Sequence, residues 1–275
     1  QVAQIVQTVE KSTPVEHSLP GFGWTVKKVK RWVEARFQLR VSRSLLWRIL
    51  RRGRLSWKKC RKVLKKADPE KRRAYMEVFG ALYAQMCSDK LRLVYVDEAH
   101  FHRDLDAGYT WSLRNEPAYR LSDCAPLSDR INWYGAYDFS KGRCFIWNEG
   151  ACNGEHTVQF LEKLAVWLSD SDVPTTIIWD GAPWHRNKTV QQKATELKLT
   201  LQRLPGYSPD LNPIEGLWKW MREDVTQHFC YPTMRELFDA CKAFIDRINQ
   251  DSVAVVQRLW PKFELDPDYE KLLIS

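Results

Sequence analysis

The sequence predicts a mixed α/β domain, in which helices pack on a central sheet, preceded by an all-α helix-turn-helix domain. Lys and Arg dominate the first third of the chain, within segments of helical periodicity. β-rich segments follow from residue 91 onward, and beyond them helices alternate with short apolar strands. With 275 residues, 44% of them hydrophobic, the chain can form one large domain and a smaller one.

Basic residues are concentrated near the N-terminus. Residues 1–90 contain 22 Lys and Arg against 7 Asp and Glu, whereas residues 91–275 contain 21 against 27. Between Lys27 and Lys66, 17 basic residues stand with a single acidic residue, Glu34. A basic run is usually a solvated face, but this one is interleaved with tryptophans and favours a polyanionic partner. We therefore expect this region to bind nucleic acid.

Two helices in the basic region are typical of a helix-turn-helix. The first, over 25–37, carries apolar residues at helical spacing, and the second, over 43–52, has Ser42 as its N-cap. Because the second helix of this motif lies in the DNA major groove, Arg43 and Ser44 are expected to reach base edges. The expected DNA contacts here are Arg43, Ser44, Arg48, Arg51, Arg52, Lys58 and Lys59. The alternative is an ordinary helical hairpin with solvated basic faces.

Composition and turn signals divide the chain into five parts. Buried strands are expected over 91–98 and 175–180, because each is a short apolar run bounded by polar residues. Further β-rich segments are "YTWSLR", "RINWYGAYDF", "RCFIWNEG" and "LTLQRL". Helices are expected over 68–88, 155–169, 188–197, 213–228 and 234–249. The expected parts are an N-terminal helix or linker over 1–23, a helix-turn-helix domain over 24–66, a linker helix over 67–90, a catalytic domain over 91–250 and a C-terminal tail over 251–275.

Both buried strands finish on an aspartate, "LVYVD" on Asp97 and "TIIWD" on Asp180. Ligands of open α/β sheets bind outside the carboxyl ends of the strands, so two neighbouring strands would aim both carboxylates at one spot. Strand-end aspartates also cap turns, so each of them alone admits a structural interpretation.

A third carboxylate, Glu215, stands within the proline-rich stretch "LPGYSPDLNPIEGLW". This stretch admits a local interpretation, in which Asn212 is a helix N-cap, Pro213 is the first helical residue and Glu215 completes a capping box. In the alternative, the rigid loop delivers Glu215 to the edge of the sheet where Asp97 and Asp180 lie. The occurrence of all three acids beside a basic domain favours this second interpretation.

Three converging carboxylates repel one another and need a cation or shared protons. Hard oxygen ligands without a Cys/His set suit Mg²⁺ or Mn²⁺, which complete their coordination with phosphate oxygens. Two such ions about 4 Å apart activate the attacking oxygen and stabilise the leaving oxygen in a displacement at phosphorus. Asp97, Asp180 and Glu215 are therefore expected to be both metal ligands and catalytic residues, with two ions between them.

Three motifs together resemble the mariner-like superfamily of DDE transposases, in its bacterial insertion-sequence branch: "VDE" at 96–98, "WDGAPWH" at 179–185 and "LPGYSPDLNPIEGLW" at 204–218. The resemblance covers the order of elements over about residues 24–249. The 34 residues between Asp180 and Glu215 are a separation that the superfamily commonly shows.

The resemblance implies a ribonuclease-H-like catalytic domain with Asp97, Asp180 and Glu215 as its metal-binding triad. It also implies cut-and-paste transposition, a dimeric synapse on terminal inverted repeats of double-stranded DNA, and insertion at TA. Members usually carry Asn after the second Asp, where this chain has Gly181. They also usually carry two helix-turn-helix modules, so residues 1–23 are expected to be a linker or the remnant of the first.

Several other residues are expected near the site. His185 matches a His of the family motif, and we expect it beside the metal or the DNA rather than only packing at a helix start. Lys219 and Arg222 follow Glu215 on a predicted helix and are expected to contact DNA phosphates. Glu98 comes directly after the strand-end aspartate, so its side chain is expected on the opposite face of the strand.

The sequence therefore predicts a metal-dependent DNA transposase that acts as a homodimer, cuts transposon ends and joins the freed 3′-hydroxyl to target DNA. Two alternatives stay open, a non-catalytic DNA-binding regulator and a ribonuclease-H-like nuclease that does not join strands. The seven cysteines include no C-x-x-C pair and are expected to be reduced thiols. No apolar run reaches about 18 residues, so no membrane span is predicted, and a nucleoid location in a bacterial cytoplasm is expected.

Overall fold

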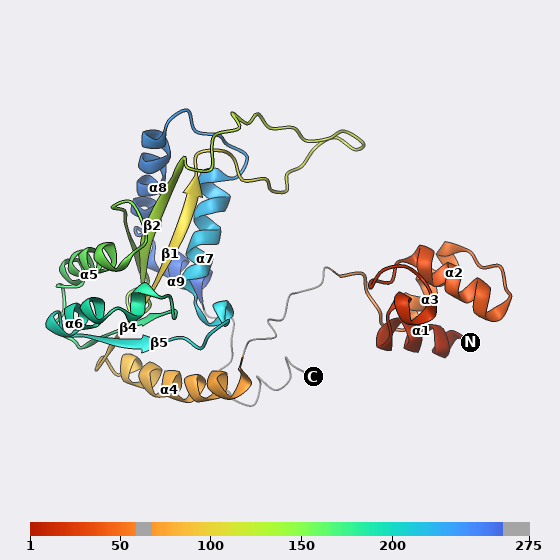
Figure 1. Cartoon of the computed structure of the whole chain (residues 1–275), viewed down its shortest axis with the longest axis horizontal. Helices are drawn as coiled ribbons and strands as arrows, with labels where there is room; N and C mark the ends of the chain where they lie inside the picture. Colours follow the sequence, from red (N-terminus) through yellow and green to blue (C-terminus); the bar gives the residue numbers. More distant parts are fainter. Residues whose placement is uncertain (59–67, 261–275) are drawn as a thin grey trace. The chain divides into compact units, whose positions relative to one another are not determined.

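The computed structural model describes residues 1–58 and 68–260. The chain forms two compact units, over residues 1–63 and 64–275 (Figure 1). No helix in the described ranges is long and apolar enough to cross a membrane. The predicted DNA contact Lys59 lies outside the described residues.

Three α-helices share the core of the N-terminal unit. Ile5, Val29 and Leu46, one from each helix, are buried in a single cluster. Residues 1–23 therefore contribute a helix to the same core as the two helices of the predicted helix-turn-helix. The elements are α1 (Val2–Lys11), the 3₁₀ turn η1 (Pro14–His17), α2 (Val26–Phe37) and α3 (Arg43–Arg52).

Side-chain caps begin both helices of this motif. The Thr25 hydroxyl oxygen accepts a hydrogen bond from the backbone N–H of Lys28 (3.3 Å), and the Ser42 hydroxyl oxygen accepts one from the N–H of Leu45 (3.1 Å). Each cap satisfies a backbone donor that has no partner within its own helix. The predicted N-cap Ser42 and the bounds predicted for α3 are confirmed.

Five strands form one mixed sheet in the second unit, in the order β3-β2-β1-β4-β5. β1, β2 and β3 pair antiparallel, whereas β4 pairs parallel with both β1 and β5. This is the predicted ribonuclease-H-like arrangement of strands first, followed by alternating helix and strand. The strands are β1 (Arg92–His102), β2 (Arg130–Asp138), β3 (Arg143–Trp147), β4 (Thr175–Trp179) and β5 (Leu199–Arg203).

Helices cover both faces of the sheet, because the alternating side chains of β1 are apolar on both sides. Leu93 and Tyr95 belong to one core cluster, and Val94 and Val96 belong to the other. The second cluster is completed by α5 (Gly154–Trp167) and α6 (Lys188–Glu196). The first is completed by α4 (Pro69–Cys87), α7 (Ile214–Met221), α8 (Met234–Ile248) and α9 (Ser252–Leu259).

The β-rich segment predicted over 109–114 is not a strand in the structure. It belongs to the long connection between β1 and β2, which extends away from the sheet (Figure 1). Trp111 within it is 100% exposed. Aromatic and β-branched residues favour strands only where neighbouring strands and a core are available for packing, and this segment has neither.

β1 and α7 differ from prediction by several residues in their bounds. β1 runs to His102 rather than ending near residue 98, because β2 pairs with it along its whole second half. α7 ends at Met221 rather than at residue 228, and the chain continues as a wider π-helical turn over Arg222–Thr226.

Replacing Leu46 by Ala is expected to lower the free energy of unfolding of the N-terminal unit by about 2–5 kcal/mol, because its side chain is fully buried among the three helices. Hydrogen-exchange mass spectrometry on the full chain would measure this as faster exchange of α2 and α3 amides. The matched control is Leu45→Ala, since Leu45 is 40% exposed and its loss should cost about 0.5 kcal/mol or less. Equal effects of the two substitutions would contradict the packing described.

Candidate active site

Asp97 lies on β1, and Asp180 directly follows the adjacent parallel strand β4. β1 and β4 pair so that Tyr95 lies beside Ile178. Side chains alternate along a strand, so two residues farther on Asp97 and Asp180 fall on the same face of the sheet. β4 ends at Trp179 while β1 continues. Asp180 therefore stands just beyond the carboxyl end of β4, and Asp97 stands where β1 loses its parallel neighbour.

The proline-rich loop brings Asn212 to Asp97. Asn212 is buried, and its Nδ2 donates a hydrogen bond to Asp97 Oδ2 (3.3 Å). The structure does not form the capping box of the local interpretation: the N-cap position of α7 is Pro213, and no side chain caps this helix. The physical reason is that the amide of Asn212 is directed at a carboxylate of the sheet instead of the helix N-terminus. Glu215, in the first turn of α7, is free of that local role.

A glycine in β2 lets α7 lie close to the sheet. Gly135 pairs with Asp97 across the β1–β2 ladder, and a Cβ atom at Gly135 would lie 2.3 Å from the Trp218 ring. Trp218 is one helical turn beyond Glu215, so this contact sets the height of the start of α7 above Asp97. Glycine inside the strand pattern "NWYGAYD" is the sequence signal of such a close approach.

The three predicted carboxylates line one cleft of about 420 Å³. They reach it from β1, from the end of β4 and from the first turn of α7. The other residues around the cleft come from the turn after β4 and from the proline-rich loop: Gly181, Ala182, Arg186, Leu204, Pro205, Gly206, Tyr207, Ser208, Pro209 and Asn212. The sequence therefore identified three acids that the fold brings to a single place.

The carboxylates of the cleft differ in their electrostatic environments. Burial, together with the nearby Glu215 and Glu98, raises the pKa of Asp97 well above its usual range. Desolvation raises the pKa of Glu215. The pKa of Asp180 is lowered, chiefly by its hydrogen bond with His185. Burying an ionised carboxylate close to others is unfavourable, so the site resists full ionisation unless a cation compensates it.

The donor set of the cleft fits a hard divalent cation. Among the described residues neither Asp97 nor Glu215 forms an ion pair with Lys, Arg or His, so their oxygens are available to an ion. In the part of the chain that the structure describes, no three His, Cys, Asp or Glu side chains are already arranged around one ion position. The carboxylates of the cleft would have to turn toward a common point to hold a metal.

His185 lies directly behind Asp180. It is buried in the 3₁₀ turn η2 (Trp184–Arg186), and its Nδ1 is 2.9 Å from Asp180 Oδ1. Its Nε2 is 3.0 Å from Glu98 Oε1. Burial lowers the pKa of His185, but the hydrogen bonds to Asp180 and Glu98 outweigh it and raise the pKa to about 9. His185 therefore carries a positive charge beside the cleft carboxylates at neutral pH.

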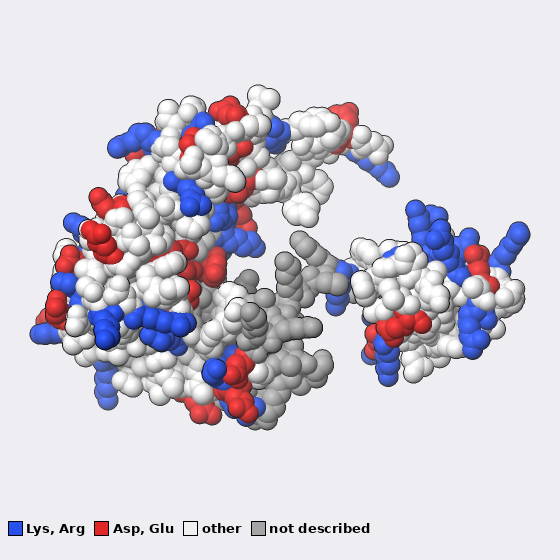
Figure 2. Space-filling model, viewed as in Figure 1, with Lys and Arg blue, Asp and Glu red and all other residues white. Residues whose placement is uncertain are grey.

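The predicted DNA contacts of the N-terminal unit are on its surface. Figure 2 shows Lys and Arg side chains projecting from this unit. Arg51 lies 5.7 Å from the centre of the Trp47 ring, so the exposed face of α3 combines cations with an aromatic surface. The exposed residues of the predicted set are Arg43, Ser44, Arg48, Arg51, Arg52 and Lys58.

The two basic residues predicted on α7 and its extension differ in their surroundings. Lys219 is exposed and pairs only loosely with Glu223 (3.6 Å). Arg222 donates to the carbonyl oxygen of His100 (2.9 Å) and lies 4.5 Å from the centre of the Phe101 ring. Arg222 therefore joins the π-helical turn to the end of β1, a role that the sequence did not indicate.

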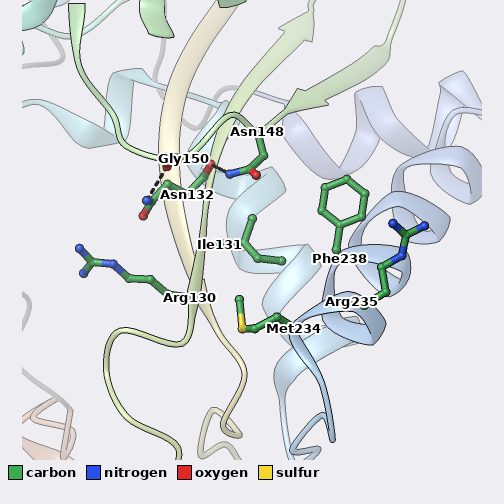
Figure 3. A pocket seen from close by; sticks show the side chains of 8 residues that line it. All are labelled: Arg130, Ile131, Asn132, Asn148, Gly150, Met234, Arg235 and Phe238. Carbon is green, nitrogen blue, oxygen red and sulfur yellow. Dashed lines mark hydrogen bonds between the residues drawn. The ribbon is translucent and has the colours of Figure 1, made fainter.

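A second cavity, of about 400 Å³, lies between the start of β2, the end of β3 and the start of α8 (Figure 3). Asn148 donates to the carbonyl oxygen of Asn132 (2.6 Å), and Asn132 Nδ2 donates to the carbonyl oxygen of Gly150 (2.7 Å). These bonds close the loop after β3 onto β2. The cavity shares no residue with the carboxylate cleft.

Known proteins resemble this chain in sequence and in fold. It is 20% identical over 241 residues to the insertion element IS630 uncharacterized 39 kDa protein of Shigella sonnei, covering 86% of this chain and 69% of that protein. It is 28% identical over 92 residues to the uncharacterized protein y4pE/y4sA of Sinorhizobium fredii, covering 34% of this chain and 65% of that protein.

Solved structures of Mos1 share the fold. The Mos1 strand transfer complex matches with a TM-score of 0.69 at 18% identity, over 98% of this chain and 76% of that chain. The Mos1 mariner paired end complex with Mn matches with a TM-score of 0.69 at 16% identity, over 98% of this chain and 77% of that chain.

Two families match consecutive parts of the chain. Residues 20–78 match the winged helix-turn-helix family, in agreement with the predicted motif. Residues 92–237, more than half of the chain, match the DDE superfamily endonucleases and include all three carboxylates of the cleft. The chain belongs to the DDE superfamily endonucleases.

Proposed function

We propose that this protein is a DNA transposase that cleaves phosphodiesters at transposon ends and transfers the 3′-hydroxyl to target DNA. The observation that carries the proposal is the convergence of Asp97, Asp180 and Glu215 on one cleft. Membership of the DDE endonucleases and the likeness to an insertion-element protein support it. Cut-and-paste movement and insertion at TA stay predictions from the family resemblance.

The cleft residues have distinct tasks in this proposal. When bound, two Mg²⁺ or Mn²⁺ ions would activate the attacking oxygen and stabilise the leaving oxygen. Asp97 and Asp180 would hold them from the sheet, and Glu215 from α7. Asn212 keeps the Asp97 carboxylate in place, and the proline-rich loop restricts how far the start of α7 can move. The protein thus contributes position and charge rather than a covalent step.

The basic N-terminal unit would supply DNA binding. Arg43 and Ser44, at the start of α3, would reach bases, while Arg48, Arg51 and Arg52 would meet phosphates. Lys58, Lys59 and Lys219 would add phosphate contacts. Binding to the genome of a bacterial cell would place the protein on the nucleoid.

A homodimer is the assembly that we propose. The connection between β1 and β2 carries exposed apolar side chains that no core covers: Tyr109, Trp111, Leu113, Tyr119, Leu121 and Leu127. An exposed apolar surface of this density is typical of a protein interface. A second copy of the chain fits as its partner, because joining two transposon ends needs two active sites.

Two other functions are separable by the reaction products. A DNA-binding regulator would not need a half-buried carboxylate such as Asp97, whose pKa is raised by desolvation and by neighbouring acids and which is unfavourable to keep. A nuclease with the same cleft would cut DNA without joining it. A Mg²⁺-dependent assay on DNA that carries the cognate ends identifies a transposase by the joined strand-transfer product.

Replacing Asp180 by Asn is expected to abolish cleavage while leaving binding to transposon ends within about twofold, because the substitution removes charge at the reaction centre and touches no DNA contact. Gel electrophoresis of cleaved ends and a band-shift titration measure the two effects. Asp246→Asn is the control, since Asp246 is exposed on α8 and is not among the residues that line the carboxylate cleft. Cleavage of the cognate ends by Asp180→Asn would disprove the assignment.

Mn²⁺ at about a hundred times its Kd is expected to raise the Tm of the catalytic unit by about 5–10 °C. In Asp97→Asn this rise should disappear, while the Tm without metal should be no lower, because a half-buried carboxylate facing like charges has been removed. Differential scanning calorimetry measures both quantities. An Asp97→Asn protein that keeps the full metal-dependent rise would contradict the proposed metal site.

Replacing Trp111 and Leu121 together by Ser is expected to weaken dimerisation at least tenfold without changing the Tm, because both side chains are more than 90% exposed and support no core. Analytical ultracentrifugation gives the dimer Kd. Val166→Ser is the control, since Val166 is 73% exposed but lies on α5. An unchanged Kd in the double variant would assign the dimer contact to another surface.

A further inference from the structure

Hydrogen bonds connect three side chains behind the cleft, from Asp180 through His185 to Glu98 on the opposite face of the sheet. The His185 ring lies parallel to the Trp179 ring, with centroids 4.2 Å apart and an interplanar angle of 9°. Its two nitrogens contact two different carboxylates, Asp180 at 2.9 Å and Glu98 at 3.0 Å. His185 is fully buried, and the Glu98 side chain is 8% exposed.

Each ring nitrogen of His185 lies within hydrogen-bond distance of one carboxylate oxygen, so the ring is held from two sides. Glu98 also accepts a hydrogen bond from Trp184 Nε1 (3.1 Å). Glu98 Oε1 is therefore the shared partner of two aromatic ring nitrogens from the turn that follows β4. The stacking on Trp179 leaves the imidazole little freedom to tilt.

Glu98 and Asp97 are neighbours in β1, but their side chains lie on opposite faces of the sheet. Side chains alternate along a strand, so Asp97 points to the cleft and Glu98 to the side covered by α5 and α6. Glu98 does not line the cleft. Among the described residues its hydrogen-bonded link to Asp180 runs through His185, which is fully buried.

Asp180 depends on such support more than Asp97 does. It lies beyond the last residue of β4, and its side chain is 53% exposed. Its Oδ1 accepts from His185 Nδ1 and from the backbone N–H of Ala182 (2.9 Å). Within the described ranges its Oδ2 makes no hydrogen bond. Two donors thus hold one oxygen and leave the other available.

We propose that Glu98 is a positioning residue for the catalytic centre, which fixes His185 so that Asp180 presents Oδ2 to the cleft. This inference rests on the proposed function, in which Asp180 holds a divalent cation. Groups behind a metal ligand orient it, and their loss typically weakens metal binding about 10–100-fold. The pair Asp97–Glu98 therefore supplies a ligand on one face of the sheet and the support for a second ligand on the other.

The test is the affinity of the full-length protein for Mn²⁺, measured by electron paramagnetic resonance of the free ion. Glu98→Gln keeps the size of the side chain but removes its charge, and it is expected to raise the Kd about tenfold or more. Glu155→Gln is the matched control, because Glu155 is exposed on α5 on the same side of the sheet. An unchanged Kd in Glu98→Gln would overturn the proposal.

A double-mutant cycle separates positioning from general loss of stability. If Glu98 acts through His185, the Kd of Glu98→Gln combined with His185→Gln should be no higher than that of His185→Gln alone. Independent, multiplying effects would overturn the proposal. If Glu98→Gln melts near the assay temperature, Glu98→Asp replaces it in the same cycle, with an expected Kd between those of the native protein and His185→Gln.

Asp180→Asn, measured in parallel, separates failure of this inference from failure of the proposed function. Loss of Mn²⁺ binding in Asp180→Asn, with native affinity in Glu98→Gln, would overturn only the role of Glu98. Native Mn²⁺ affinity in Asp180→Asn would overturn the metal site itself, and the positioning role with it.

Discussion

The parallel pairing of β1 with β4 is the constraint on which the candidate active site depends. It is a backbone interaction, so it sets the relative positions of Asp97 and Asp180 whatever their side chains do. A shift of the register by one residue would turn one of the two carboxylates to the opposite face of the sheet. The buried apolar residues on both sides of β1 and β4 oppose such a shift, because every one of them would change its core.

Rigid surroundings hold the carboxylates of the cleft close together against their mutual repulsion. The loop from Pro205 to Pro213 has few accessible backbone conformations, and it joins the end of β5 to the start of α7. Asn212 donates to Asp97, and His185 contacts Asp180. Two of the three acids are therefore each held by a neighbouring side chain at one carboxylate oxygen.

The sequence allowed the order of elements, the sheet class and the three carboxylates to be predicted, because each depends on local signals. Asp180 and Glu215 stand at element ends, and such ends are marked by changes of periodicity and by prolines. The bounds of α3 were predicted for the same reason, since Ser42 caps its start.

Other features depend on partners distant in the chain, and no local pattern reports them. Asn212 has the chemistry of an N-cap, yet its partner is a residue 115 positions away. Glu98 and His185 are 87 positions apart, so their pairing depends on which strands become neighbours. Trp111 has a strand-forming side chain, but the fold offers it no neighbouring strand. The strand around Trp111 was predicted wrongly because tertiary contacts override local preference. The contacts of Asn212 and Glu98 were not predicted, because they depend on residues far away in the chain.

The contact between Gly135 and Trp218 links the residue types that can be tolerated in β2 and in α7. With the indole ring occupying the space of a missing Cβ atom, a larger residue in β2 requires a smaller one on α7. Substitutions at Gly135 and Trp218 are therefore tolerated only together. A larger residue at either position would push α7 away from β2 and tilt the first turn, which carries Glu215. The position of Glu215 relative to Asp97 thus depends partly on the lack of a side chain at Gly135.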